Sequence, residues 1–140
     1  MENQITTNFT LKELTYSTVA AAAKINNTPN EDEYNNLVKL CKEVLQPIRD
    51  KYGDGILVTS GYRCEALNKR VKGSKTSAHM KGCAADIDTP NNEKLFHLIV
   101  SMINNNEISV DQLIDEKNFS WLHIGIKPNP KDNRNQVLHL

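Results

Sequence analysis

The sequence predicts an α+β domain in which helices flank a small, mainly antiparallel sheet. Two observations carry this prediction: helical patterns come mostly in the first half of the chain, and the strand-like runs after them are joined by short turns. The length of 140 residues suits one modest hydrophobic core. We therefore expect a single domain that spans residues 1–140.

Composition narrows the functional classes. Apolar residues make up 39% of the chain and charged residues 24%, as in ordinary soluble globular proteins. Seventeen basic residues cancel seventeen acidic ones, so no overall field attracts nucleic acid or an anionic membrane. The sequence lacks both a secretory signal and a run long enough to span a membrane. We expect a monomer that is made in the cytoplasm without a signal peptide and binds neither nucleic acid nor membrane.

The first third of the chain is predicted to be mostly helical. Residues 1–8 are polar and expected to be frayed, Thr10 caps a short helix over residues 11–14, and the alanine-rich residues 17–25 form another. The strongest helical pattern covers residues 31–52. There the apolar residues recur at steps of three and four: Tyr34, Leu37, Leu40, Cys41, Val44, Leu45 and Ile48.

Proline and glycine mark the breaks in this helical region. Pro47 predicts a kink or local break near Leu45, because proline cannot donate a helical hydrogen bond. Residues 62–71 and 92–104 are predicted to form two further helices. Between them, residues 72–82 are rich in glycine, serine and lysine, which predicts a loop.

Four runs predict the strands of the sheet: residues 56–60, 83–89, 111–116 and 120–127. A short polar connection at residues 117–118 joins the last two, and the tail, residues 128–140, is predicted to be largely irregular. Alternation places one set of side chains of residues 83–89 on each face: Ala84, Asp86 and Asp88 against Cys83, Ala85 and Ile87. In the last strand the two sets are Leu122, Ile124 and Ile126 against Trp121, His123 and Gly125.

A pattern in the predicted loop and the strand after it indicates a metal site. Residues 77–86 read S-x-H-x-x-G-x-A-x-D, so His79 and Asp86 can converge on one point if the chain turns at Gly82. His123 projects away from the apolar face of its strand, beside a glycine that leaves room. Two histidines and one aspartate suit a single zinc ion with its fourth position open, which is typical of a catalytic site.

Several motifs together resemble a known family. They are the opening NFTLKEL, the SGYRC turn, the S-x-H-x-x-G-x-A-x-D core, the QLIDE strand and the closing W-x-H. From about Asn8 to its end, the chain resembles the zinc D-Ala-D-Ala carboxypeptidase family, peptidase family M15, which also holds phage L-alanyl-D-glutamate endolysins. The QLI-x-E strand and the W-x-H ending resemble its carboxypeptidase-like branch.

The resemblance implies a fold and an activity. The fold is hedgehog/D-Ala-D-Ala-peptidase-like, and the activity is zinc-dependent hydrolysis of peptide bonds in peptidoglycan stem peptides, either of a terminal D-alanine or inside the peptide. Endolysins that resemble the chain reach the wall through a separate membrane pore. The resemblance therefore implies action at the bacterial cell wall after release, for a protein of phage or bacterial origin.

Arg63 and Ser77 are candidate substrate-binding residues. Arg63 lies in the SGYR turn, where a guanidinium can grip a carboxylate or carbonyl, and the matching arginine of the family contacts substrate. Ser77, two residues before His79, can bind the substrate backbone or orient the loop. Asp88 shares a face with Asp86 and is either a partner of the metal ligands or a solvated loop residue.

Glu116 is the predicted catalytic base. Several branches of the family have an acidic residue three positions before the last histidine, but here that position is Ser120. Glu116 matches the glutamate of the QLI-x-E strand and lies one strand away from His123, whereas Asp115 points to the opposite face of a regular strand. The departure at Ser120 allows an inactive relative as the alternative to an enzyme.

Two alternatives follow. A catalytically silent zinc-containing relative would bind cell wall or a protein partner, in keeping with Ser120. A purely structural zinc site would need a fourth protein ligand from Cys64, Cys83 or Asp88. The three cysteines are odd in number and share no C-x-x-C spacing, so they are expected to be reduced thiols. His97 and His139 are expected to be structural or exposed.

Overall fold

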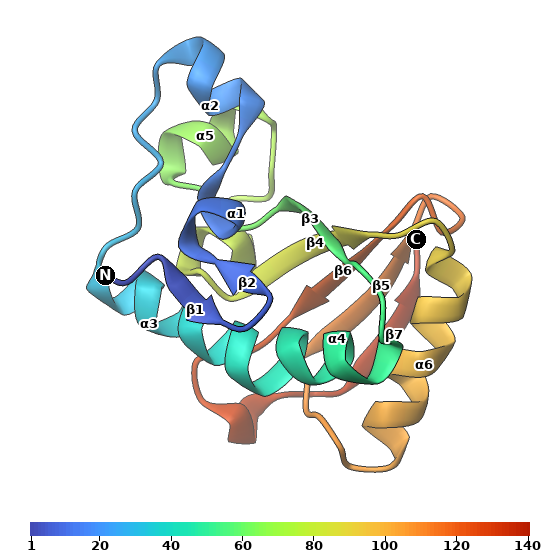
Figure 1. Ribbon diagram of the computed structural model, residues 1–140. Coiled ribbons are helices and arrows are strands. Elements are labelled where there is room, and N and C mark those ends of the chain that lie inside the picture. The colour runs from blue at the N-terminus through green and yellow to red at the C-terminus, as the bar shows by residue number, and fades with distance from the viewer.

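The computed structural model describes residues 1–140 and confirms the α+β class, with a five-stranded sheet at its centre (Figure 1). The order across the sheet is β3-β4-β6-β5-β7. The strands are β3 (Leu57–Ser60), β4 (Ala84–Asp88), β6 (Trp121–Gly125), β5 (Gln112–Glu116) and β7 (Gln136–His139). The first three pairings in this order are antiparallel, and only β5 and β7 run parallel. The sheet is therefore mainly antiparallel, as expected.

One face of the sheet carries the hydrophobic core. Two long helical stretches contribute to it, α3 (Glu31–Leu40) continuing into α4 (Gln46–Tyr52), and α6 (Asn92–Asn104). The apolar sets predicted for β4 and β6 belong to the core, including Ile87, Leu122 and Ile124, each with no exposed surface. The alternation predicted for both strands is confirmed, and the other face remains free to carry polar side chains. No helix of the structure is long and apolar enough to cross a membrane.

The break predicted near Leu45 is a short π-helix, η1 (Cys41–Leu45). The amide of Gln46 donates to the carbonyl of Cys41, five residues earlier, and Pro47 follows at the start of α4. Because proline has no amide hydrogen and its ring crowds the preceding turn, one wider turn lets the helix continue without a sharp kink.

The N-terminal prediction was wrong in part, because residues 1–8 are not frayed. Residues Gln4–Thr6 form β1, which pairs with β2 (Phe9–Thr10) in a small hairpin. Phe9 is buried in the core, and the Tyr34 hydroxyl donates to the carbonyl of Glu2. Burial of one aromatic side chain and a hydrogen bond to α3 fix a segment whose composition alone indicates disorder. After the hairpin come α1 (Leu11–Thr15), capped by Thr10 as predicted, and α2 (Thr18–Ala23).

The prediction for the tail was also wrong, because residues 128–140 are not largely irregular. After a short 3-10 helix, η3 (Pro130–Asp132), the chain forms β7 at the edge of the sheet. Backbone bonds from Gln136 to the Asp111 carbonyl and from Leu140 to the Asp115 carbonyl bracket this strand. Its four residues are too few for an alternating pattern to stand out, and the pairing with β5 supplies the strand geometry.

Candidate active site

His79 lies on η2 (Ala78–Lys81), a 3-10 turn inside the predicted loop. Ser77 starts this turn, since its hydroxyl oxygen accepts from the amide of His79 at 3.2 Å. Gly82 ends it with φ +73°, and a Cβ there would lie 2.3 Å from the carbonyl oxygen of Glu33 on α3. Only glycine fits both this backbone conformation and this close approach. The predicted turn at Gly82 is confirmed, and it directs the chain from His79 into β4.

The imidazole of His79 is fixed by a carbonyl that sequence reasoning missed. Its Nδ1 lies 2.7 Å from the carbonyl oxygen of Gly61, and the residue is only 2% exposed. Because a carbonyl can only accept, Nδ1 carries the hydrogen, and Nε2 presents a lone pair to the site. Gly61 is itself wedged against α1, where a Cβ would be 2.2 Å from the carbonyl oxygen of Leu14. The glycine of SGYR is the sequence signal for this support.

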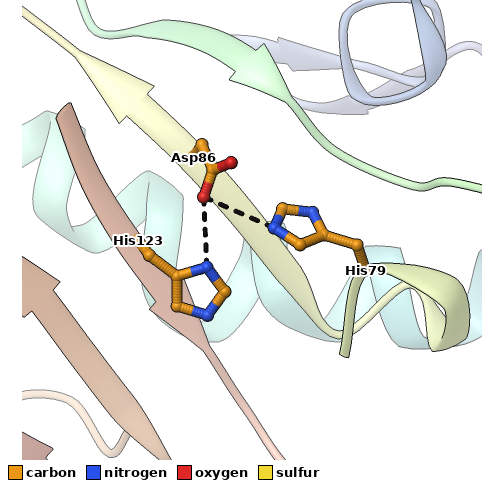
Figure 2. Close-up of side chains that lie close together, drawn as sticks. All are labelled: His79, Asp86 and His123. Carbon is orange, nitrogen blue, oxygen red and sulfur yellow. Dashed lines mark hydrogen bonds and ion pairs between the residues drawn. The ribbon is translucent and has the colours of Figure 1, made fainter. Parts of the chain in front are cut away.

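Asp86 and His123 come together because β4 and β6 are paired at these two residues. Asp86 Oδ1 lies 3.1 Å from His123 Nδ1 and 3.4 Å from His79 Nε2 (Figure 2). The two imidazole rings flank this oxygen, with centroids 5.2 Å apart. His79, Asp86 and His123, predicted as ligands from their spacing, thus form one cluster whose ligand atoms all lie within 4.8 Å of one another.

The separations within this cluster suit a zinc ion. Bonds of roughly 2.0–2.1 Å at tetrahedral angles place neighbouring ligand atoms about 3.3 Å apart. The distances from Asp86 to the two histidines, 3.1 Å and 3.4 Å, bracket that value. Two imidazole nitrogens and one carboxylate oxygen are also donors that zinc accepts in catalytic sites. The donor set and the two distances from Asp86 therefore fit the expected ion.

The electrostatics of the cluster favour an ionised carboxylate. Burial alone would raise the pKa of Asp86, but the neighbouring imidazoles of His123 and His79 outweigh burial and hold the pKa well below its usual range. Asp86 is therefore negatively charged at neutral pH. A charged carboxylate between two imidazoles favours a cation at this point.

The cluster opens into a cleft of about 840 Å³ on the polar face of the sheet. All three candidate ligands line this cleft, together with Arg63, Ser77 and Glu116. The structure therefore brings all six predicted site residues to one cavity. Its size is in the ordinary range for sites that bind small molecules or short peptides.

Arg63 lies beside the cluster, at the end of the turn that follows β3. Its amide donates to the carbonyl of His79 at 3.1 Å, and its Nη2 donates to the Ser77 hydroxyl at 3.4 Å. Burial holds the pKa of Arg63 below its usual value, although the nearby charge of Asp86 offsets part of this effect. The Nε hydrogen is buried without a protein partner. Arg63 thus has donor capacity left beside the ligand cluster, and Ser77 orients both the loop and this guanidinium.

Glu116 and Asp115 lie on opposite faces of β5, so the predicted strand phase is confirmed. Ile114 pairs with His123, and Glu116, two residues further on the same face, lines the cleft. Asp115 is buried on the other face, where it accepts from the amide of Phe119 and lies 2.9 Å from His139 Nδ1. The catalytic role of Glu116 remains a prediction.

The other candidates take structural positions. Asp88 accepts from the Asn92 side chain at 2.7 Å and does not line the cleft. Ser120 donates to the carbonyl of Lys117 within the β5–β6 turn. All three cysteines are free, and neither Cys64 nor Cys83 joins the ligand cluster. A structural zinc site requires a fourth protein ligand. None of the three candidates for it, Cys64, Cys83 and Asp88, belongs to the cluster.

Sequence reasoning missed one wall of the cleft. Asp111, Lys127 and Arg134 line it on the side of β5, and Arg134 belongs to the tail that had been predicted to be irregular. The only signal in the sequence is Asp111, the acidic residue directly before the QLIDE strand, and no pattern in the sequence identifies Arg134 as its partner.

Comparison with known proteins agrees with this geometry. No curated protein matches the chain. The family model described as Peptidase M15 matches residues 7–125, a span that contains all three candidate ligands, Arg63, Ser77 and Glu116. The chain therefore belongs to the peptidase M15 family.

Proposed function

We propose that the protein is a zinc metallopeptidase that hydrolyses peptide bonds in peptidoglycan stem peptides, as a D-Ala-D-Ala carboxypeptidase or an endolysin-type endopeptidase. Membership of the M15 family and the His–Asp–His cluster support a metallopeptidase. The zinc ion and the substrate are our proposal. The observation that carries it is a ligand cluster in which Asp86 lies at zinc-compatible distances from both histidines, in a cleft that also holds Glu116.

The chain supplies the parts that such a hydrolysis requires. A zinc ion, when bound, would polarise the scissile carbonyl and lower the pKa of a bound water. His79, Asp86 and His123 would hold this ion. Glu116 accepts a proton from the attacking water and delivers it to the amine that leaves, because it is the acidic residue of the cleft that is neither a candidate ligand nor paired with an arginine.

Arg63 holds the substrate in this proposal. Its half-buried guanidinium lies beside Asp86 and lines the cleft, where a carbonyl or carboxylate of the peptide can accept hydrogen bonds from it. Ser77 fixes the position of that guanidinium. We expect a monomer that acts at the bacterial cell wall after release, without a nucleic-acid or membrane partner.

The alternative is a catalytically silent relative that binds zinc and either cell wall or a protein. Ser120 favours it, because a serine stands where several branches of the family have an acid, and its hydroxyl is engaged within a turn. The position of Glu116 in the cleft favours the enzyme.

Digestion of purified wall fragments separates these functions. We expect peptide products, identified by mass spectrometry, that cease with a chelator and return when zinc is added. Glu116→Gln should keep zinc and lose turnover, and Glu43→Gln, an exposed glutamate on η1, serves as the matched control. Sugar cleavage, or no peptide cleavage with any metal, would rule out the proposed activity. Chelator-sensitive binding to wall without cleavage would favour the silent relative.

A further inference from the structure

The wall of the cleft beside β5 carries a fixed pair of charges. Arg134 donates from Nε to Asp111 Oδ1 and from Nη2 to Asp111 Oδ2, each at 2.9 Å, in a bidentate arrangement. The amide of Arg134 adds a third bond to Oδ1 at 3.2 Å. Lys127 Nζ lies 3.7 Å from Oδ2. All three side chains line the cleft that contains the candidate ligands.

Asp111 holds Arg134 without consuming its donor capacity. Asp111 is only 7% exposed, and the Arg134 side chain is 53% exposed. A guanidinium has five N–H donors in a rigid plane, and the carboxylate takes two of them. Hydrogen bonds from Arg134 also hold the pKa of Asp111 below its usual range, so the aspartate stays ionised and the orientation is maintained. The remaining donors are left for another acceptor, on a side chain that is half exposed.

The cleft as a whole is cationic, although the chain is neutral. Its lining contains five basic residues, Arg63, Lys72, Lys81, Lys127 and Arg134, and three acidic ones, Asp86, Asp111 and Glu116. The formal charge of the entire chain is zero. Positive charge is thus concentrated where substrate would bind, and a divalent metal would add to it. Such a cleft favours an anionic ligand.

The two arginines lie on opposite sides of the candidate metal site. Arg63 follows β3 at one edge of the sheet, and Arg134 precedes β7 at the other. Asp86 on β4 and His123 on β6 lie between them. A peptide with its scissile bond at the metal could therefore reach both cations. Arg134 and Lys127 also lie outside residues 7–125, the part of the chain that the family model describes.

We propose that Arg134, oriented by Asp111 and assisted by Lys127, binds a free carboxylate of the substrate on the side of the metal site away from Arg63. This inference rests on the proposed peptidase function and specifies its substrate class, namely peptides that carry an ionised carboxylate beyond the scissile bond. A planar, bidentate donor is the arrangement that recognises a carboxylate with directional specificity.

A purely structural role for the pair would have different consequences. Asp111 and Arg134 lie where the tail joins the sheet, and neighbouring backbone bonds tie Gln136 to Asp111 and Asn135 to Val110. If the pair served only this junction, its loss would lower stability and reduce cleavage of all peptides alike. Recognition of a carboxylate makes the loss depend on the charge of the peptide.

Matched peptides test this distinction. One is a stem peptide with its free carboxylates, and its twins each have one carboxylate, internal or C-terminal, converted to the carboxamide. We expect the unmodified protein to cleave the acid peptide with a higher kcat/KM than one of its carboxamide twins. Arg134→Gln should raise KM for the acid roughly 10-fold or more, the usual effect of losing a charge-assisted hydrogen bond, with little change in kcat. KM for that twin should stay nearly constant.

Three further variants sharpen the result. Arg134→Lys should recover part of the preference, and Lys127→Gln should weaken it less than Arg134→Gln, because an ammonium is a point charge without the oriented planar donors of Arg134. Lys51→Gln removes an exposed ion pair with Glu107, outside the cleft, and should leave the preference unchanged. Melting temperatures of all variants separate lost stability from lost recognition.

The outcomes distinguish this inference from the proposed function. Equal cleavage of the acid and both twins, or an equal loss for all of them in Arg134→Gln, would overturn carboxylate recognition while leaving the peptidase intact. If no peptide is cleaved, calorimetric titration of the zinc-loaded protein with the same peptides decides. An Arg134-dependent preference for the acid supports the inference although the peptidase function has failed, and equal affinities overturn both.

Discussion

Two segments deliver charged side chains to the same cleft by different means. The ligand loop, residues 77–86, is shaped by its own residues, through the Ser77 cap and the Gly82 turn, and the bond from His79 to Gly61 anchors it to the rest of the molecule. The C-terminal segment, residues 126–140, is held by pairing with β5, more than twenty residues earlier in the sequence. The loop therefore has a readable local pattern, whereas the C-terminal segment takes its conformation from its neighbour.

The largest effect is expected at the loop and its partner strands. His79→Ala, Asp86→Ala and His123→Ala should each lose most of the bound zinc and all detectable hydrolysis, because each removes one of three protein ligands. Metal analysis of the purified proteins measures the first effect. His97→Ala is the matched control, since His97 is exposed on α6. A ligand variant with full zinc occupancy would remove that residue from the site.

The second-largest effect is expected at Glu116 on β5, which lines the same cleft. Glu116→Gln should reduce turnover by roughly 10²–10⁴-fold while zinc content and fold persist, since the amide is nearly isosteric but cannot shuttle a proton. Single-turnover kinetics on a stem peptide provides the measurement.

Two controls locate this base. Asp115→Asn, on the buried face of β5, should lower stability and cost far less turnover. Asp88→Asn, outside the cleft, should cost little. Full activity in Glu116→Gln together with an inactive Asp88→Asn would transfer the role to Asp88.

The ligand loop could be predicted from the sequence, whereas the C-terminal segment could not. The ligands were predictable because metal chemistry restricts both residue type and spacing, and because alternation placed His123 and Glu116 on the polar face. Neither β7 nor the pairing of Asp111 with Arg134 was predictable, because four residues carry too little pattern and an ion pair across twenty-three positions leaves no periodic signal. The support of His79 by Gly61 likewise depends on a close approach to α1.

Gly82 is restricted by its close approach to α3 as well as by its backbone conformation. Gly82 and Gly53 have almost the same backbone conformation, with φ of +73° and +74°, but a Cβ at Gly53 would meet nothing within 4 Å. Gly53→Ala should therefore cost about 1 kcal/mol, the conformational term alone. Gly82→Ala adds a clash with the Glu33 backbone and should cost roughly 3 kcal/mol or more, with weaker zinc binding. Urea unfolding compares the two, and equal losses would mean that α3 yields to the loop.

The smallest effect is expected in acid, at the junction of the C-terminal segment. The pKa of Asp111 is held below its unfolded value chiefly by the hydrogen bonds from Arg134, so this carboxylate contributes stability above the unfolded pKa of about 4. That contribution is lost as the pH falls through the lower, folded pKa. Asp111→Asn should therefore be less stable than the unmodified protein at neutral pH, and the difference should shrink at about pH 3. Because half of the Arg134 side chain is exposed, solvent and salt weaken the pair, and we expect a smaller loss than for Gly82→Ala. Urea unfolding at both pH values measures it. A difference that persists in acid would mean that the shape of the residue, rather than its charge, holds the segment against β5.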